Sequence, residues 1–387
     1  MARTNGMAPA ERARRVGIYT QPLQMNYGGI LQTWALQTVL HRRGFEAATF
    51  TFDQHFHLPS WRKPYVYAKR LAGKCLGRQR PIFWEEAFNR SYDFGSQHIR
   101  PFIERKVRQR AYRDVREIRE DEFGILLAGS DQVWRPRYNA RPPQTIGHAF
   151  FDFAQNWTVR RIAYAASFGT DEWEYTPEQT RECAALAKRF AAISVREKAG
   201  IRLCRDHLGT EAVQVPDPTL LLDRADYEAL IQNGDTRAPD GDLLAYILDD
   251  SPAGEELVRR VARAGGFKPF RIRIWRGVRD ADLAQPSVEQ WLRCFRDAKA
   301  VVTDSFHACV FSAVFGKPFV VLGNPVRGIS RYESLLEGLG LGSRLVRTPD
   351  EGEAAFLREG ALSVERIAGN LALLRRSADA FLLKALG

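Results

Sequence analysis

The segment spanning residues 301–321 constrains the fold most, because two kinds of hydrophobic pattern alternate within it. A short apolar run ends in the polar cluster Thr303-Asp304-Ser305, and an apolar helical stretch begins near His307. A second apolar run follows at residues 319–321. This order predicts strand, turn, helix and strand, which is the repeating unit of a parallel sheet. His307 would lie at the carboxyl end of the first strand, the edge where open α/β sheets bind ligands.

The same alternation recurs along most of the chain. Each predicted strand is a short apolar run that ends in a polar or glycine-containing turn, and most are followed by a helical pattern. The predicted strands cover residues 15–19, 46–52, 125–128, 161–166, 192–195, 212–215, 243–248, 270–275 and 301–303.

The length of 387 residues fits two α/β domains better than one. We expect residues 1–14 to be a disordered leader and 15–235 to be a Rossmann-like domain. A basic, aromatic and largely helical insertion interrupts this domain at 53–124. Turn-forming residues at 232–242 predict a linker, and 243–387 would form a second Rossmann-like domain whose final helix could pack across both.

Composition excludes several classes of protein. No apolar run reaches about 18 residues, as a membrane-spanning helix would need, and five dispersed cysteines without a C-x-x-C pair indicate reduced thiols rather than a zinc site. Residues 61–120 contain 16 Lys and Arg against 7 Asp and Glu. This excess predicts either a solvated basic face or attraction to phosphorylated metabolites, nucleotide sugars, lipid-linked glycans or an anionic membrane surface. No nucleic-acid-binding motif accompanies it.

The candidate catalytic residues follow strands. His307 would lie at a helix N-terminus, where it could donate a proton to a phosphate or carboxylate, or only cap a turn. Asp131, directly after the strand at 125–128, could act as a base, orient a sugar hydroxyl or cap the next segment. Ser305 could bind a ligand or cap the helix that follows it.

The candidate binding residues form two groups. Arg196 and Arg331 could bind an anion bidentately, although arginines at such positions are often only paired or solvated. Trp134 could stack on a sugar or fill the core, and Asp217, between two prolines, is as consistent with a rigid turn as with a site. The turn Asn26-Tyr27-Gly28-Gly29 could hold a ligand by its backbone N–H groups.

Taken together, the chain resembles the polysaccharide pyruvyl transferase family over about residues 15–340. The resemblance rests on seven ordered blocks, each weak alone. They are Asn26-Tyr27-Gly28-Gly29 with its helix, Gly129-Ser130-Asp131-Gln132-Val133-Trp134, Tyr164-Ala165-Ala166-Ser167-Phe168-Gly169, Ser194-Val195-Arg196-Glu197, Asp217-Pro218-Thr219-Leu220-Leu221, Thr303-Asp304-Ser305-Phe306-His307 and Gly316-Lys317-Pro318-Phe319.

This resemblance implies a glycosyltransferase-B-like fold, with two Rossmann-like domains facing across a cleft. It also implies that pyruvate moves from phosphoenolpyruvate, as co-substrate, to two hydroxyls of a sugar, giving a cyclic ketal and phosphate without a metal or other cofactor. His307 and Asp131 would be catalytic. The donor would be bound by Arg196, Ser305, Lys317 and Arg331, and the acceptor by Asn26, Tyr27, Gly28, Gly29, Ser130 and Trp134.

One block departs from the family pattern. Some members carry Arg-Leu-His where this chain has Ser305-Phe306-His307, so Arg331 or Lys317 would have to supply the missing charge, or the donor differs. The alternatives are a glycosyltransferase that uses a nucleotide sugar and a non-catalytic protein that binds glycans or anions. The resemblance places the protein in exopolysaccharide or cell-surface glycan biosynthesis. It would act in the cytoplasm on a free or lipid-linked sugar, with possible contact to the inner face of the membrane.

Overall fold

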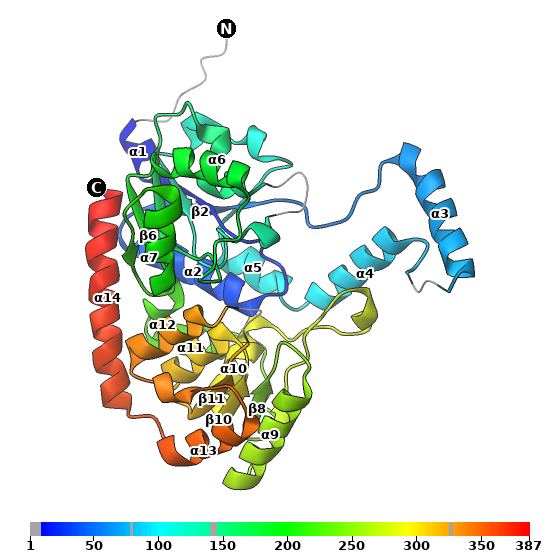
Figure 1. Ribbon diagram of the computed structural model, residues 1–387, viewed down its shortest axis with the longest axis vertical. Coiled ribbons are helices and arrows are strands. Elements are labelled where there is room, and N and C mark those ends of the chain that lie inside the picture. Colours follow the sequence, from blue (N-terminus) through cyan, green and yellow to red (C-terminus); the bar gives the residue numbers. More distant parts are fainter. Residues whose placement is uncertain (1–8, 78–79, 140–144, 325–327) are drawn as a thin grey trace.

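The computed structural model describes residues 9–77, 80–139, 145–324 and 328–387 (Figure 1). Two parallel sheets lie one beyond the other along the long axis of the molecule, each covered by helices, which confirms the predicted α/β class with two Rossmann-like domains. Residues 1–8 of the predicted leader lie outside the described residues. Its remainder is not disordered, because Pro9–Ala13 form helix α1 and the Arg12 Nε donates to the Phe123 carbonyl at 3.3 Å.

The first sheet has seven parallel strands in the order β3-β2-β1-β4-β5-β6-β7. The strands are β1 Arg15–Tyr19, β2 Glu46–Thr51, β3 Gln109–Ala111, β4 Ile125–Ala128, β5 Arg160–Ala166, β6 Ala192–Val195 and β7 Val213–Gln214. The chain runs from β1 through β2 to β3 on one side and then returns to β4 on the other side of β1, so the strand order reverses between β1 and β4. Strand β3 was not predicted, because its three residues are polar or small and lie exposed at the edge.

Four helices accompany this sheet: α2 Tyr27–Arg42, α6 Pro177–Ala187, α7 Lys198–Leu203 and α8 Arg224–Gln232. Helix α2 is buried along most of its length, as its nearly continuous apolar sequence predicts. Helix α6 begins with a capping box in which Thr176 and Gln179 satisfy each other's backbone N–H groups. Helix α7 continues directly into a π-helical turn, Cys204–Leu208.

The insertion at 53–124 contains three helices, α3 Lys63–Cys75, α4 Trp84–Ser96 and α5 Arg100–Lys106. Helices α3 and α4 form an arm that projects away from the body of the molecule (Figure 1). Helix α5 returns to the first domain, where Phe102 and Ile103 are buried.

The second sheet has five parallel strands in the order β12-β11-β10-β8-β9. They are β8 Leu243–Tyr246, β9 Pro269–Arg271, β10 Ala300–Thr303, β11 Phe319–Leu322 and β12 Leu345–Val346. The helices of this half are α9 Pro252–Gly265, α10 Val288–Asp297, α11 Phe306–Val314, α12 Ser330–Leu339 and α13 Pro349–Glu359. Here the strand order reverses between β8 and β10.

The final helix, α14 Val364–Leu386, packs across both halves, as predicted. On the second half, the Asn370 side chain donates to the Leu339 carbonyl at 2.9 Å. On the first, Arg375 donates to the Leu220 and Leu222 carbonyls, and Arg160 donates to the Ala385 carbonyl. We keep 15–235 and 243–387 as the proposed domain limits, since the chain passes from one sheet to the other between α8 and β8.

The two halves share one apolar core. Tyr27 from α2 stacks on Trp291 from α10 with ring centroids 5.2 Å apart, and Tyr227 from α8 meets Phe311 from α11 at 4.9 Å. This packing fixes the carboxyl edges of the two sheets relative to each other. In the part of the chain that the structure describes, no helix is both long and apolar enough to cross a bilayer.

Candidate active site

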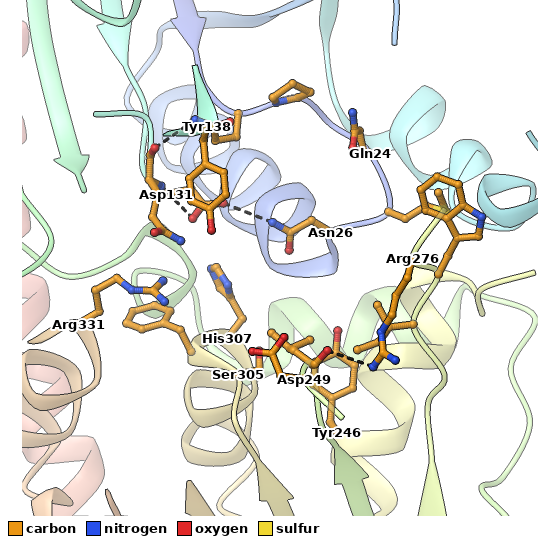
Figure 2. A pocket seen from close by; sticks show the side chains of 18 of the residues that line it. Gln24, Asn26, Asp131, Tyr138, Tyr246, Asp249, Arg276, Ser305, His307 and Arg331 are labelled. Carbon is orange, nitrogen blue, oxygen red and sulfur yellow. Dashed lines mark hydrogen bonds between the residues drawn. The ribbon is translucent and has the colours of Figure 1, made fainter. Parts of the chain in front are cut away.

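A cavity of about 610 Å³ lies where the carboxyl edges of the two sheets meet (Figure 2). One wall comes from the loops after β1, β2 and β4, and the other from the loops after β8, β9 and β10 with the start of α12. Both points at which the strand order reverses therefore open into the same cavity, which is where doubly wound sheets bind ligands. Five of the predicted site residues line it: Asn26, Asp131, Ser305, His307 and Arg331.

His307 is the second residue of α11 and is only 8% exposed. The loop before it is fixed by Asp304, whose carboxylate accepts the backbone N–H groups of Leu248 and Asp249 at 2.6 and 2.9 Å. The imidazole reaches across to the first turn of α2, so closely that a Cβ on Gly28 would lie 2.0 Å from Nδ1. His307 therefore lies near the N-termini of two helices, whose unpaired N–H groups favour anions.

Asp217 faces His307 from the first half of the molecule. Its Oδ2 lies 3.6 Å from the His307 Nε2, an ion-pair distance, and accepts hydrogen bonds from Ser130 Oγ and Arg196 Nη1 at 3.0 Å each. Thr219 donates to Oδ1 through its N–H at 3.0 Å and its hydroxyl at 2.6 Å. Burial alone would raise the pKa of Asp217, but His307, Arg196 and Thr219 together hold that pKa far below its usual range. Asp217 is thus a charged partner for the imidazole.

Asp131 adopts a backbone conformation that few residues other than glycine take, with φ of +73°. Such strain costs about 1–3 kcal/mol and concentrates at functional sites. The Asp131 carbonyl holds this turn by accepting hydrogen bonds from the N–H groups of Val133 and Ser167. Its carboxylate accepts a long hydrogen bond of 3.4 Å from Asn26 Nδ2 (Figure 2), which joins the β1 and β4 loops across the point of reversal.

Two buried arginines lie over the Phe306 ring, with Cζ atoms 4.3 Å (Arg196) and 5.7 Å (Arg331) from its centroid. Arg196 does not line the cavity, so the predicted direct contact with the donor does not fit the structure. Its Nη1 is 3.0 Å from Asp217 and its Nη2 3.7 Å from Asp131. It holds the two carboxylates in place from behind the cavity wall.

Arg331, by contrast, lines the cavity from the start of α12. Burial lowers the pKa of Arg331, and the nearby Arg196 lowers it further. Tyr332, Asp131 and Glu197 raise this pKa, but by less than burial and Arg196 lower it. An anion bound in the cavity would favour the charged guanidinium. Of the two residues expected to replace the missing family arginine, Arg331 is therefore in position.

The other candidate, Lys317, lies on the opposite side of the second sheet. It precedes β11, whose carboxyl end faces the cavity, so Lys317 is at the amino edge. Burial lowers its pKa, and Arg224 lowers it further. The prediction that Lys317 binds the donor does not fit this placement.

Two aromatic residues expected at the acceptor are in the core. Trp134 is fully buried, stacks on Phe150 at 4.7 Å and donates its indole N–H to the Ala149 carbonyl. Tyr27 is buried against Trp291 and donates to the Pro286 carbonyl at 2.8 Å. Both bury a large ring and satisfy its one polar atom, so neither is available to a sugar.

The remaining predicted residues act on the cavity indirectly. Ser130 is buried and orients Asp217. Gly29 lies against the Asn26 side chain, since a Cβ there would meet Nδ2 at 3.1 Å. Sequence reasoning missed several cavity-lining side chains, among them Tyr138, Tyr246, Trp275 and Arg276.

The described residues contain no group of three or more His, Cys, Asp or Glu side chains placed to hold a metal ion. The cavity is lined by a histidine that is paired with the buried Asp217, by a strained aspartate and by a buried arginine. These groups can bind an anion, donate a proton and accept one.

Comparison with known proteins bears on the family. The family model described as polysaccharide pyruvyl transferase matches residues 26–325, which is well over half of the chain and contains most of the cavity residues. No curated protein sequence matches the chain.

Among solved structures the chain is similar to glycosyltransferases at low sequence identity. The glycotransferase of kitacinnamycin matches with 16% identity over 96% of this chain and 99% of its own, at a TM-score of 0.46. Arabidopsis thaliana UGT89C1 in complex with UDP-L-rhamnose matches with 10% identity over 96% of this chain and 97% of its own, at a TM-score of 0.47.

Proposed function

The chain belongs to the polysaccharide pyruvyl transferase family, and on that basis we propose that it is a ketal pyruvyl transferase. Membership of the family makes it a transferase with a sugar or glycan acceptor. In our proposal phosphoenolpyruvate is the donor, and two hydroxyls of the sugar receive its pyruvyl group as a cyclic ketal. No metal or further cofactor takes part, and the product belongs to exopolysaccharide or cell-surface glycan biosynthesis.

The observation that carries this proposal is that His307 and Arg331 line one cavity at the carboxyl edges of both sheets. Phosphoenolpyruvate carries a phosphate and a carboxylate, which suit a guanidinium and the first turns of α2 and α11. Ser305 lines the cavity at the N-cap of α11 and makes no side-chain capping bond, so its hydroxyl suits the same ligand.

The proposed reaction begins when C3 of phosphoenolpyruvate takes a proton and becomes a methyl group, which leaves C2 electrophilic. One sugar hydroxyl then bonds to C2, and the second displaces phosphate. Of the two hydroxyl protons, one restores the proton that the proton donor gave to C3, and the other leaves with phosphate. His307 is the proton donor, and the Asp217 carboxylate 3.6 Å away stabilises the protonated imidazole.

On the acceptor side we propose that Asp131 removes the hydroxyl proton. Asn26 orients the Asp131 carboxylate, and Gly28 leaves room for the imidazole beside α2. The indole of Trp275 lines the cavity and is half-buried, which suits stacking against a sugar ring. Arg196 is a positioning residue for Asp131 and Asp217.

Titration calorimetry of the purified protein distinguishes this proposal from a nucleotide-sugar transferase. We expect phosphoenolpyruvate to bind, and UDP-glucose neither to bind nor to compete. Binding of UDP-glucose in competition with a phosphoenolpyruvate analogue would favour the glycosyltransferase. Binding of phosphoenolpyruvate that His307→Ala does not alter, together with unchanged function in cells, would favour a non-catalytic binding protein.

We also propose that the protein acts in the cytoplasm, at the inner face of the membrane. Sugar acceptors built on a lipid carrier are presented there. The net charge of +11 is consistent with attraction to that anionic surface.

A further inference from the structure

The projecting arm has an unusual charge. Residues 54–84 contain seven Lys and Arg and no Asp or Glu. The cations are Arg62, Lys63, Lys69, Arg70, Lys74, Arg78 and Arg80, of which Arg78 lies outside the described residues. A segment with cations alone is attracted to anionic surfaces and repelled by other cationic ones.

One side of α3 is occupied by the segment that leads into α4. The Tyr67 ring meets Phe83 edge-on at 4.9 Å, and Arg70 forms two hydrogen bonds of 2.6 Å with Glu85 and one of 2.9 Å with the Ile82 carbonyl. These contacts hold α3 and α4 together as one unit. They also determine which side of α3 remains uncovered.

The uncovered side carries an apolar stripe, which we define as Trp61, Tyr65, Ala68, Ala72 and Leu76. Trp61 is 80% exposed, Tyr65 71% and Leu76 81%, and both alanines are exposed. Spacings of four, three, four and four residues place them along one face of the helical segment. Isolated exposed apolar residues are common, but a row of them with two aromatic members indicates a surface that binds something.

The base of the arm adjoins the cavity. The Trp275 indole, which lines the cavity, donates to Ser91 Oγ of α4 at 2.8 Å and meets the Phe88 ring at 5.6 Å. Gln54, at the start of the acid-free segment, also lines the cavity. The arm is therefore joined to the body of the molecule beside the cavity.

We propose that the apolar stripe and the flanking cations of α3 dock the protein on an anionic lipid bilayer. The choice of a membrane as the partner rests on the proposed function, since a lipid-borne sugar acceptor would be presented at a membrane. Tryptophan and tyrosine favour the boundary between lipid headgroups and acyl chains, and lysine and arginine bind the anionic headgroups. A second copy of this chain docked stripe to stripe is the wrong partner, because the acid-free segments 54–84 of the two copies would repel each other.

The test is flotation of the full-length protein with vesicles of phosphatidylcholine alone or with phosphatidylglycerol added. We expect the protein to float with the anionic vesicles and not with the neutral ones, and to dissociate as salt is raised. Trp61→Ser with Tyr65→Ser, and separately Lys63→Glu with Lys69→Glu and Lys74→Glu, should each lower the partition coefficient at least tenfold.

The matched control reverses three exposed cations on α14, Arg366→Glu, Arg376→Glu and Lys384→Glu, on the side of the molecule opposite the arm (Figure 1). It makes the same change in net charge and should retain most of the binding. If the control and the arm variants lost vesicle binding equally, the proposal would be overturned. It would also be overturned if the wild-type protein did not float with anionic vesicles, even if the arm bound an acidic protein instead.

Calorimetry with phosphoenolpyruvate on the same variants separates this inference from the reaction. The arm variants should bind phosphoenolpyruvate as the wild type does. Flotation without pyruvyl transfer would refute the proposed function and leave docking intact. Transfer to a free sugar without flotation would refute docking alone.

Discussion

The Oδ2 atom of Asp217 lies 3.6 Å from the Nε2 atom of His307, so a carboxylate from one half of the molecule faces an imidazole from the other. Asp217 follows the last strand of the first sheet, and His307 is the second residue of the helix after the central strand of the second. The pair exists only when the two halves are packed together. The reaction that we propose therefore depends on the shared core as much as on the side chains themselves.

Replacing Asp217 by Asn should destabilise the protein, because it leaves the buried Arg196 without its closest anion. Loss of one partner of a buried ion pair costs about 3–5 kcal/mol. The free energy of unfolding, measured with denaturant at neutral pH, checks this. Asp206→Asn, which breaks an exposed pair with Arg205, should change it little.

The Asp217 carboxylate also makes the free energy of unfolding depend on pH. Because the pKa of Asp217 is lower in the folded protein than in the unfolded chain, its contribution to stability is fully present above the unfolded value of about 3.9. It is lost as pH falls below that value towards the folded pKa. Denaturant curves between pH 5 and pH 2 should show this acid loss in the wild type, and less of it in Asp217→Asn. Parallel curves would contradict the assignment.

Substituting His307 by Gln should lower turnover by about 10²–10⁴-fold, the usual contribution of a general acid. Glutamine is of similar size and the position is at a cavity, so the melting temperature should change little. Steady-state phosphate release and circular dichroism measure the two effects. His41→Gln, an exposed histidine near the end of α2, serves as control. A variant that keeps full turnover would remove His307 from the chemistry.

Gly28→Ala should lower turnover at least tenfold while leaving the protein folded. A Cβ at this position would lie 2.0 Å from the His307 Nδ1, so the imidazole must move. Alanine otherwise favours a helix over glycine by about 1 kcal/mol. Gly369→Ala in α14, where a Cβ would meet no atom within 4 Å, reports that helix effect alone. Undiminished turnover in Gly28→Ala would show that the position of the imidazole is unimportant.

Arg331→Gln should weaken phosphoenolpyruvate binding at least tenfold, since it removes the buried cation that lines the cavity. Lys317→Gln should leave the affinity within twofold, because that side chain lies at the opposite edge of the sheet. Calorimetry with both variants is a direct comparison of the two residues that could replace the missing family arginine. The reverse ranking would mean that the donor binds elsewhere.

The strands of the two sheets could be predicted to within a few residues because they are short apolar runs between turn-forming residues. Strand β9 was an exception, since it ends at Arg271 rather than near residue 275. Strand β3 was missed because an exposed edge strand of polar residues carries no such signal, and β12 was missed because it has only two residues. The position of the site followed as well, since polar residues gather at the carboxyl ends of parallel strands.

The direction of individual side chains could not be predicted in the same way. Trp134 and Asp131 are three residues apart in one block, yet one fills the core and the other lines the cavity. Asp217 pairs with a residue from the other half of the molecule, and Gly28 is required by that same distant imidazole. Such contacts depend on how the two sheets pack, which no local pattern records.

The central claim is best tested by incubating the purified protein with phosphoenolpyruvate and a panel of free and lipid-linked sugar acceptors. Phosphate release and the mass of each acceptor are then measured. We predict that phosphate appears only with an acceptor, and that the acceptor gains the mass of a pyruvate ketal. Absence of both with every acceptor, together with no binding of phosphoenolpyruvate by calorimetry, would contradict the account and point to a different donor in the same cavity.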